Sequence, residues 1–349
     1  MSNYRFQRGA RHIAFRYDII RGLIKTGEAD VLSCYIKYNS ENTIKRTASI
    51  SLAEKNSIDF LRDKIRAVML IDGAEKALGT FILSTPKLDE NGASGSYTAE
   101  AYDTTNILKE DCFTERAFFA AGSRYDDIIG SIILSAGVTD YYLPTIDVRL
   151  SVDREFELGR NKLDVIGELL DEVNFNPLIA DENGRLTTSK YVQPGVSSVS
   201  KEYYDDEVSV ISPKYESETD YYNVPNVFVA RCDNPELKQE YYSVYVNDNP
   251  SSRLSTISRG RRIVSPIYQP DYIESQEALD EYIRRKAAEE SAVFDKLKIK
   301  TALMPDHGYK DVIRIRNGDI SGIYLEKSWE MELKAGAMMT HNLVGVYEV

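Results

Sequence analysis

The sequence predicts an α+β fold that is rich in β-structure, with helices inserted between runs of strands. Alternating apolar and polar residues dominate the first hundred positions, helical spacing appears in the middle, and alternation returns in the last fifty residues. Alternation with a period of two indicates a half-buried strand, whereas apolar residues three or four positions apart indicate an amphipathic helix. A hydrophobic content of 42% over 349 residues is enough for a sizeable core and for two or three domains.

The first hundred residues are expected to form a barrel or sandwich of short strands. The clearest strand runs from Ile44 to Leu52, where the even positions are mostly apolar, so one face should be buried and the other wet. Asn91 and Gly92 supply a turn that needs a positive φ angle. The other expected strands cover residues 31–38, 65–71, 79–86 and 95–103.

Two helices are expected in the middle of the chain. Ser123, with Asp126 three residues later, predicts the start of the first helix, and Gly137 predicts its end. Asn161 predicts the start of the second helix, which should end before Pro177. The apolar residues of each segment share one helical face, so both helices should pack against a core.

A domain boundary is expected between residues 193 and 223, where prolines, a glycine, a serine cluster and an acidic run occur together. Strands should follow at 226–231 and 241–247. The stretch from Asn247 to Gln269 is expected to be a long exposed loop, and such loops often carry function.

A third helix should begin near Ser275 and run past Phe294, because the apolar residues of this segment have helical spacing. The last fifty residues should return to strands, since Trp329 and Met331 alternate with acidic residues. A final strand at 343–349 would close a sheet.

The net charge is −12, but residues 1–25 hold six basic residues and only one acidic residue, Asp18. The remainder therefore carries −17, and an acidic body disfavours stable nucleic-acid binding. The basic N-terminal arm is either a docking segment for an acidic partner or a solvated terminus. No apolar run approaches the length of about 20 residues that crosses a membrane, and no export signal is visible. We therefore expect no membrane span and synthesis in the cytoplasm.

Tyrosine is frequent, with 24 residues that include four tandem pairs. Neighbouring residues of a strand point to opposite faces, so one ring of each pair should face away from its own core. Exposed tyrosines are favoured at protein interfaces, which makes Tyr203, Tyr221 and Tyr241 candidate interface residues. Ordinary β-propensity with partial burial is the alternative explanation.

A second candidate interface is the basic stretch that holds Arg259, Arg261 and Arg262 in an otherwise acidic chain. The planar guanidinium pairs with carboxylates through two hydrogen bonds, and arginine is accordingly enriched at interfaces. Plain solvation of the three side chains is the alternative.

No catalytic or metal-binding set is visible in the sequence. His12, His307 and His341 are isolated from one another, and none lies in a metal-binding motif. His307 precedes Gly308 in an expected turn, which favours a polar surface role. We therefore expect no enzymatic activity, no metal and no cofactor. The cysteines lack CxxC spacing and are expected to be small buried thiols: Cys34, Cys112 and Cys232.

Several segments of the sequence resemble the tail or baseplate hub proteins of bacteriophages and of phage-tail-like bacteriocins, in particular those of Gram-positive phages and defective prophages. Residues 44–52 are similar to an early strand of these hub proteins. Residues 161–170, with 181–191 downstream, are similar to the central helix and hairpin of the family. The stretch between 289 and 312 also resembles the family, so the likeness spans nearly the whole chain.

The resemblance implies a domain organisation. Residues 1–104 would form one tail-tube-like β-barrel or sandwich domain, and residues 200–235 joined with 296–349 would form another. Residues 105–199 would be a helical α/β insertion, and residues 236–295 would be an insertion made of a loop and a long helix.

The resemblance also implies a structural, non-enzymatic role in a virion or tail-like particle, such as a contractile injection system. Three copies would form a homotrimeric ring that adapts the hexameric tail tube to a threefold spike or tip. The implied partners are the tail tube protein, the spike or tip protein and other baseplate proteins, with the tape measure protein as a further candidate. Two other functions stay open: a tail-associated peptidoglycan hydrolase and a carbohydrate-binding tail module.

Overall fold

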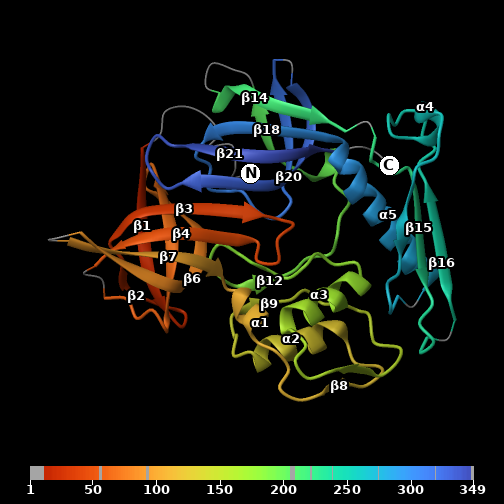
Figure 1. Ribbon diagram of the computed structural model, residues 1–349, viewed down its shortest axis with the longest axis horizontal. Helices are drawn as coiled ribbons and strands as arrows, with labels where there is room; N and C mark the ends of the chain where they lie inside the picture. The colour runs from red at the N-terminus through yellow and green to blue at the C-terminus, as the bar shows by residue number, and fades with distance from the viewer. Residues whose placement is uncertain are drawn as a thin grey trace.

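The computed structural model describes residues 12–54, 57–91, 94–204, 209–220, 222–237, 239–273, 275–318 and 320–346. Strands make up 47% of the structure and helices 16%. The predicted β-rich α+β class is therefore confirmed. Figure 1 shows a large sheet at the left and top, a helical unit below it, and a small sheet with a long helix at the right.

The first part of the chain forms an antiparallel run of strands in the order β3-β4-β7-β6-β5-β1-β2. The five strands predicted here are all present, and in β4 Ala48, Ile50 and Leu52 are buried as expected. The alternate polar residues of β4 are half-buried rather than wet. Gly92, in the predicted turn, lies outside the described residues. The strands are β1 (Ile13–Arg21), β2 (Ile24–Glu28), β3 (Val31–Asn39), β4 (Arg46–Ala53), β5 (Asp63–Ile71), β6 (Ala74–Asn91) and β7 (Ser94–Asp103).

Strands β1 and β2 are not predicted by the sequence pattern, because charged residues interrupt their apolar positions. In the structure Asp18 of β1 is buried, and its carboxylate accepts from Arg16 at 2.8 Å and lies 2.7 Å from the ammonium of Lys25. Arg16 also pairs with Glu75 of β6 at 2.6 Å. From Ile13 onward the N-terminal segment is therefore part of the sheet, which corrects the expectation of a solvated or docking arm over this part.

A second group of strands comes from the later part of the chain, in the order β13-β19-β20-β21-β18-β14. As predicted, Trp329 and Met331 of β20 are buried, and so is Leu333 directly after it. Part of the segment expected to be a boundary at 193–223 belongs to β13 and β14. The strands are β13 (Val199–Tyr204), β14 (Ile211–Thr219), β18 (Asp295–Ala302), β19 (Val312–Asn317), β20 (Ile320–Glu332) and β21 (Met338–Gly345).

Strand β20 joins the two groups into one 13-stranded sheet, because its second half pairs with β3. Trp329 lies opposite Tyr38 across this seam, and their rings stack with centroids 5.5 Å apart. One hydrophobic core runs through both groups and includes Ile36 and Ile50 as well as Ile299 and Met331. The division into separate tube-like domains stays a prediction, since the sheet and the core are continuous.

The helical unit below the sheet packs α2 and α3 around Ile129, Ile166 and Leu169. The side chain of Asn161 accepts from the backbone N–H groups of Leu163 and Asp164, as a capping residue should. The first helix instead begins after Arg124 without a side-chain cap. The elements are α1 (Asn106–Glu110), β8 (Ala117–Phe119), α2 (Tyr125–Ser135), β9 (Tyr141–Tyr142), β10 (Arg154–Phe156), α3 (Lys162–Glu172), β11 (Ile179–Ala180), β12 (Leu186–Thr187) and η2 (Val196–Ser198).

The third unit is a small sheet in the order β16-β15-β17, with α5 packed on one face. The side chain of Ser275 caps α5 as predicted, but this helix ends at Ser291 and a 3-10 turn carries the chain to Phe294. The prediction of a long loop from Asn247 to Gln269 is wrong, because this segment contains a short helix and a strand that pairs with β15. The elements are β15 (Val227–Cys232), β16 (Tyr241–Val246), α4 (Thr256–Arg259), β17 (Val264–Tyr268), α5 (Gln276–Ser291) and η3 (Ala292–Phe294).

Candidate functional site

The three arginines of the candidate interface have different surroundings. Arg259 ends α4 and donates through Nη1 to the backbone oxygen of Val224 at 2.5 Å. Burial, together with the charge of Arg261, lowers the pKa of Arg259. Arg261 and Arg262 are exposed, and the guanidinium of Arg261 lies 5.7 Å from the centroid of the Tyr222 ring. Only the latter two arginines therefore present their charge freely at the surface of the chain.

The candidate tyrosines are also divided between core and surface. Tyr203 is buried, and its hydroxyl lies 2.8 Å from Nε2 of His307. The expectation that this side chain is exposed at an interface is therefore wrong for the isolated chain. Tyr241 is half-buried against the core between β16 and α5. Tyr221 lies outside the described residues. In the described pairs the more exposed ring belongs to the second tyrosine: Tyr142, Tyr204 and Tyr242. The predicted alternation is confirmed there, while an interface role stays a prediction.

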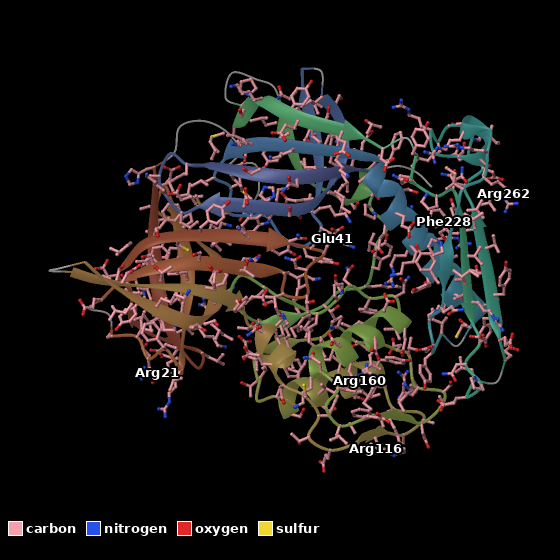
Figure 2. The ribbon with its side chains drawn as sticks, in the orientation of Figure 1. Arg21, Glu41, Arg116, Arg160, Phe228 and Arg262 are labelled. Atoms are coloured by element: carbon pink, nitrogen blue, oxygen red, sulfur yellow. The ribbon has the colours of Figure 1, made fainter. Side chains whose placement is uncertain are left out.

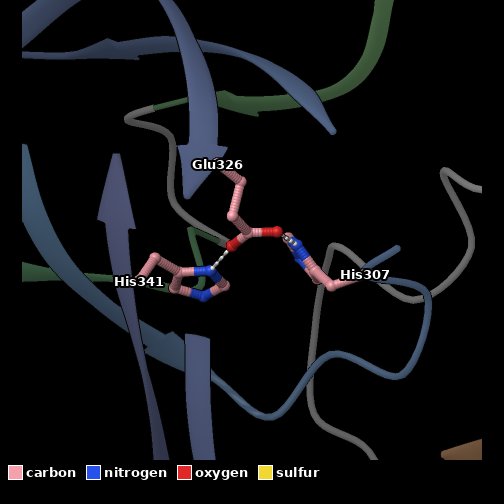
Figure 3. A group of neighbouring side chains, drawn as sticks. All are labelled: His307, Glu326 and His341. Atoms are coloured by element: carbon pink, nitrogen blue, oxygen red, sulfur yellow. Dashed lines mark hydrogen bonds and ion pairs between the residues drawn. The ribbon is translucent and has the colours of Figure 1, made fainter. Parts of the chain in front are cut away.

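A buried polar cluster, not predicted from the sequence, connects His307, Glu326 and His341 (Figure 3). Glu326 lies on β20, His341 lies on the neighbouring strand β21, and His307 lies in the loop after β18. Each imidazole Nδ1 lies 2.6 Å from a different carboxylate oxygen of Glu326. All three side chains are fully buried. The expectation of a surface role for His307 is therefore wrong, since Glu326 supplies a partner inside the core.

Two hydroxyl groups complete the surroundings of the cluster. The Nε2 atom of His307 lies 2.8 Å from the Tyr203 hydroxyl, and the Nε2 atom of His341 lies 2.8 Å from the Thr301 hydroxyl. Every ring nitrogen of the two imidazoles thus has a hydrogen-bond partner. The cluster connects strands β13, β18, β20 and β21, which are four of the six strands in the second group.

The protonation of the cluster follows from burial and charge. Burial alone would raise the pKa of Glu326, but the charge of His307 and the hydrogen bonds from both imidazoles outweigh it and lower this pKa to about 2. Burial lowers the pKa of His341, and the neighbouring Glu326 carboxylate only partly opposes this. At neutral pH Glu326 is therefore ionised and His341 is uncharged. A carboxylate this deeply buried needs these hydrogen bonds to be tolerated.

The cluster has the donor types of a metal site, because two imidazoles and a carboxylate present ligand atoms within 4.8 Å of one another. The N···O distances of 2.6 Å are those of hydrogen bonds, whereas two ligands of one zinc ion lie farther apart. Complete burial also leaves no path for a substrate. The geometry is that of a structural hydrogen-bond network.

A local irregularity explains why the sequence does not reveal the cluster. Regular alternation along β20 buries the odd positions, such as Trp329 and Met331, and would turn Glu326 outward. The register between β20 and β21 shifts between Glu326 and Ser328, so both Leu325 and Glu326 are buried. Such a bulge re-aims side chains and leaves no clear trace in the sequence pattern.

The three cysteines differ in burial. Cys34 and Cys232 are buried thiols as predicted, and burial raises the pKa of Cys34 to about 12. Cys112 is only partly buried. Among the described helices, none has both the length and the apolar character needed to cross a bilayer.

No protein-family model and no curated protein matches the sequence. The structure superposes on a tail protein from Neisseria meningitidis with a TM-score of 0.65 and 12% identity, covering 95% of this chain and 96% of that chain. The chain has the fold of a phage tail protein.

Two further solved structures support the same conclusion. A prophage tail protein from Shewanella oneidensis gives a TM-score of 0.65 with 11% identity, covering 95% of this chain and 98% of that chain. A prophage tail protein from Listeria monocytogenes gives a TM-score of 0.59 with 11% identity, covering 94% of each chain. The resemblance to phage tail proteins is thus confirmed at the level of the fold. At such low identity the comparison describes the fold alone.

Proposed function

We propose that this chain is a structural hub protein of a phage tail or tail-like particle, located at the tail tip or baseplate. The observation that carries the proposal is the match of nearly the whole chain to tail proteins of similar length. A hub of this kind would be made in the bacterial cytoplasm and assembled with the tail tube protein, a spike or tip protein and other baseplate proteins, with the tape measure protein as a further candidate.

The proposed assembly is a closed ring of three copies that adapts a hexameric tube to a threefold spike or tip. The arrangement of the large sheet supports it. Two strand groups, β1–β7 and the group formed by β13, β14 and β18–β21, are held side by side by the pairing of β20 with β3. Three copies would present six such groups, which is the number needed to face a sixfold tube.

We propose that the hub acts without catalysis. Within the described ranges, the one group of three or more histidine, cysteine or acidic side chains that could hold a metal is the cluster of His307, Glu326 and His341. Its side chains are fully buried and hydrogen-bonded, which supports a structural role. Cell-wall turnover by the purified chain that a single carboxylate or histidine substitution abolishes would instead support the hydrolase alternative.

The experiment that tests the proposed ring is a measurement of mass by light scattering over a wide range of concentrations of the full chain. The proposal expects three copies per particle or a monomer that associates to three copies as the concentration rises. A chain that stays monomeric at every concentration, and that occurs at one copy per purified particle, would reject the ring.

A further inference from the structure

The small sheet has one face covered and one face open. Helix α5 covers the first face and packs Leu279 and Ile283 against Phe228 and Ala230 of β15. The opposite face, which we name the outer sheet face, carries apolar side chains that are 37% to 60% exposed: Tyr242, Val244, Val246, Val264 and Ile267. The open face of a two-layer unit is usually polar, so a contiguous apolar face indicates a contact surface.

The register confirms that these residues form one surface. Val244 of β16 and Ile267 of β17 both lie opposite Val229 of the central strand β15. Val246 and Val264 both lie opposite Val227. Two apolar rows therefore cross the sheet, and in one of them the central residue, Val227, is itself buried. Both β16 and β17 are edge strands, since each pairs only with β15 among the described strands.

A basic margin borders the outer sheet face where the chain enters β17. Arg261 and Arg262 lie just before β17, with only Ile263 between them and Val264. Both are exposed, and neither makes an ion pair with a described residue. Figure 2 shows Arg262 on the side of the sheet away from α5, whereas Phe228 lies toward the helix. Residues 253–262 hold four arginines and no acidic residue, so the other residues of the chain carry −16.

We infer that the outer sheet face binds the acidic helical unit of a second copy of this chain. This inference rests on the proposed ring. In a closed ring of three identical subunits every contact joins two unlike surfaces, one from each neighbour. The basic, apolar outer sheet face therefore needs an acidic surface with exposed apolar residues as its counterpart.

The helical unit at 105–199 is acidic in total and exposes apolar side chains. It contains 16 acidic and 9 basic residues, a net charge of −7. Phe118, Leu134 and Leu158 expose apolar side chains on it, and the carboxylates of Asp127 and Glu157 are exposed as well. The helical unit lies below the large sheet and the small sheet lies at the right edge (Figure 1), so the two units occupy different parts of the chain, which a head-to-tail contact between copies can use.

A charge exchange in the full chain tests this contact, with mass measured by sedimentation over a range of concentrations. The double variant Arg261→Glu/Arg262→Glu is expected to raise the concentration at half-assembly at least tenfold. The variant Asp127→Lys/Glu157→Lys should do the same. Combining all four substitutions in one chain should restore assembly, because each contact then pairs the same charges in exchanged positions.

A neutral variant tests the apolar part of the surface. Val264→Thr/Ile267→Thr keeps two β-branched residues and should also weaken assembly, with less dependence on salt than the charge variants. The matched control is Leu61→Thr/Arg62→Glu, which changes an exposed apolar and an exposed basic residue at the turn before β5. The control should assemble like the unchanged chain, and all variants should melt close to it because the substituted side chains are exposed.

The possible failures are distinct. An unchanged chain that is monomeric at every concentration and that occurs at one copy per purified particle rejects the proposed ring and this inference with it. If the unchanged chain forms trimers and Arg261→Glu/Arg262→Glu forms them equally well, the ring stands and the inference is wrong. If that variant forms trimers but no longer enters particles, the outer sheet face binds a different protein, which also overturns the inference.

Discussion

The 13-stranded sheet and the small sheet of β15, β16 and β17 show opposite exceptions to the rule that charged side chains lie outside and apolar side chains inside. The large sheet buries a charged cluster, in which Glu326 lies between His307 and His341. The small sheet exposes apolar side chains, among them Val264 and Ile267. A buried charge is tolerated only where its hydrogen bonds are complete, and an exposed apolar face is tolerated best where a partner covers it. The buried charge of the large sheet is thus satisfied within one chain, whereas the apolar side chains of the outer sheet face are left exposed.

The largest loss of stability is expected for Glu326→Ala. The substitution leaves two buried imidazoles without their common partner, and breaking a buried ionic group in this way costs about 3–5 kcal/mol of unfolding free energy. Denaturant titration measures the loss. Glu332→Ala on the same strand is the control, because that side chain is exposed and the change should stay within about 0.5 kcal/mol. A small effect of Glu326→Ala would mean that the cluster does not stabilise the large sheet.

The next largest loss of stability is expected for an isoleucine in the core of the large sheet, compared with an isoleucine on the small sheet. Ile299 of β18 is buried in the core of the large sheet, whereas Ile267 lies on the outer sheet face. Ile299→Ala should lower the unfolding free energy by about 2–5 kcal/mol, because it leaves a cavity. Ile267→Ala should cost less than about 1 kcal/mol in the isolated chain, where only β-propensity is lost. Equal losses of unfolding free energy for the two substitutions, measured on the monomer, would contradict the difference between the core of the large sheet and the outer sheet face.

The cluster also predicts a pH dependence. The pKa of His341 is lowered from 6.5 in the folded chain, so the unfolded chain binds more protons below about pH 6.5 and stability falls as the pH decreases from there. Glu326 has a folded pKa of about 2 against 4.5, and its contribution is lost between these values as the pH falls. One proton changes the free energy by at most about 1.4 kcal/mol per pH unit.

Thermal unfolding between pH 7 and 5, measured on the unchanged chain and on His341→Gln, isolates this contribution. The variant should be less stable at pH 7 but should lose less stability on acidification, because it lacks the titrating imidazole. A steeper loss in the variant would contradict the protonation assigned to the cluster.

The smallest effects concern the candidate arginines. Arg259→Ala removes the hydrogen bond to Val224 and should cost about 1 kcal/mol. Arg261→Ala/Arg262→Ala removes only exposed charges and should change the unfolding free energy by less than about 0.5 kcal/mol. Melting curves of the isolated chain separate the two cases. A large destabilisation by the double substitution would show that these side chains serve the fold rather than a contact.

Local patterns predict much of the fold. The alternation in β4, the cap at Asn161 and the cap at Ser275 are short-range features, so they can be recognised in one segment at a time. Strand β1 escapes this reasoning because its buried Asp18 depends on Lys25 in the next strand and on Arg16, which also reaches Glu75 59 residues away. The pairing of β17 with β15 is likewise a tertiary event inside a segment with loop-like composition.

The candidate site is less predictable than the fold. The exposed Arg261 and Arg262 can be recognised from charge alone, and the structure adds the apolar face beside them. The buried cluster cannot be found by composition, because Glu326 depends on a bulge and on partners that lie 15 and 19 positions away in the sequence. The sequence likewise does not reveal that Tyr203 is buried beside His307, because the two residues are 104 positions apart.

The most direct test of the proposed hub is electron microscopy of the assembled particle at the junction between tube and tip. The proposed hub requires three copies of this chain at that junction, each placing both of its strand groups in one ring below the tube. Density for one copy or six copies at the junction, or location of the chain elsewhere in the particle, would contradict it.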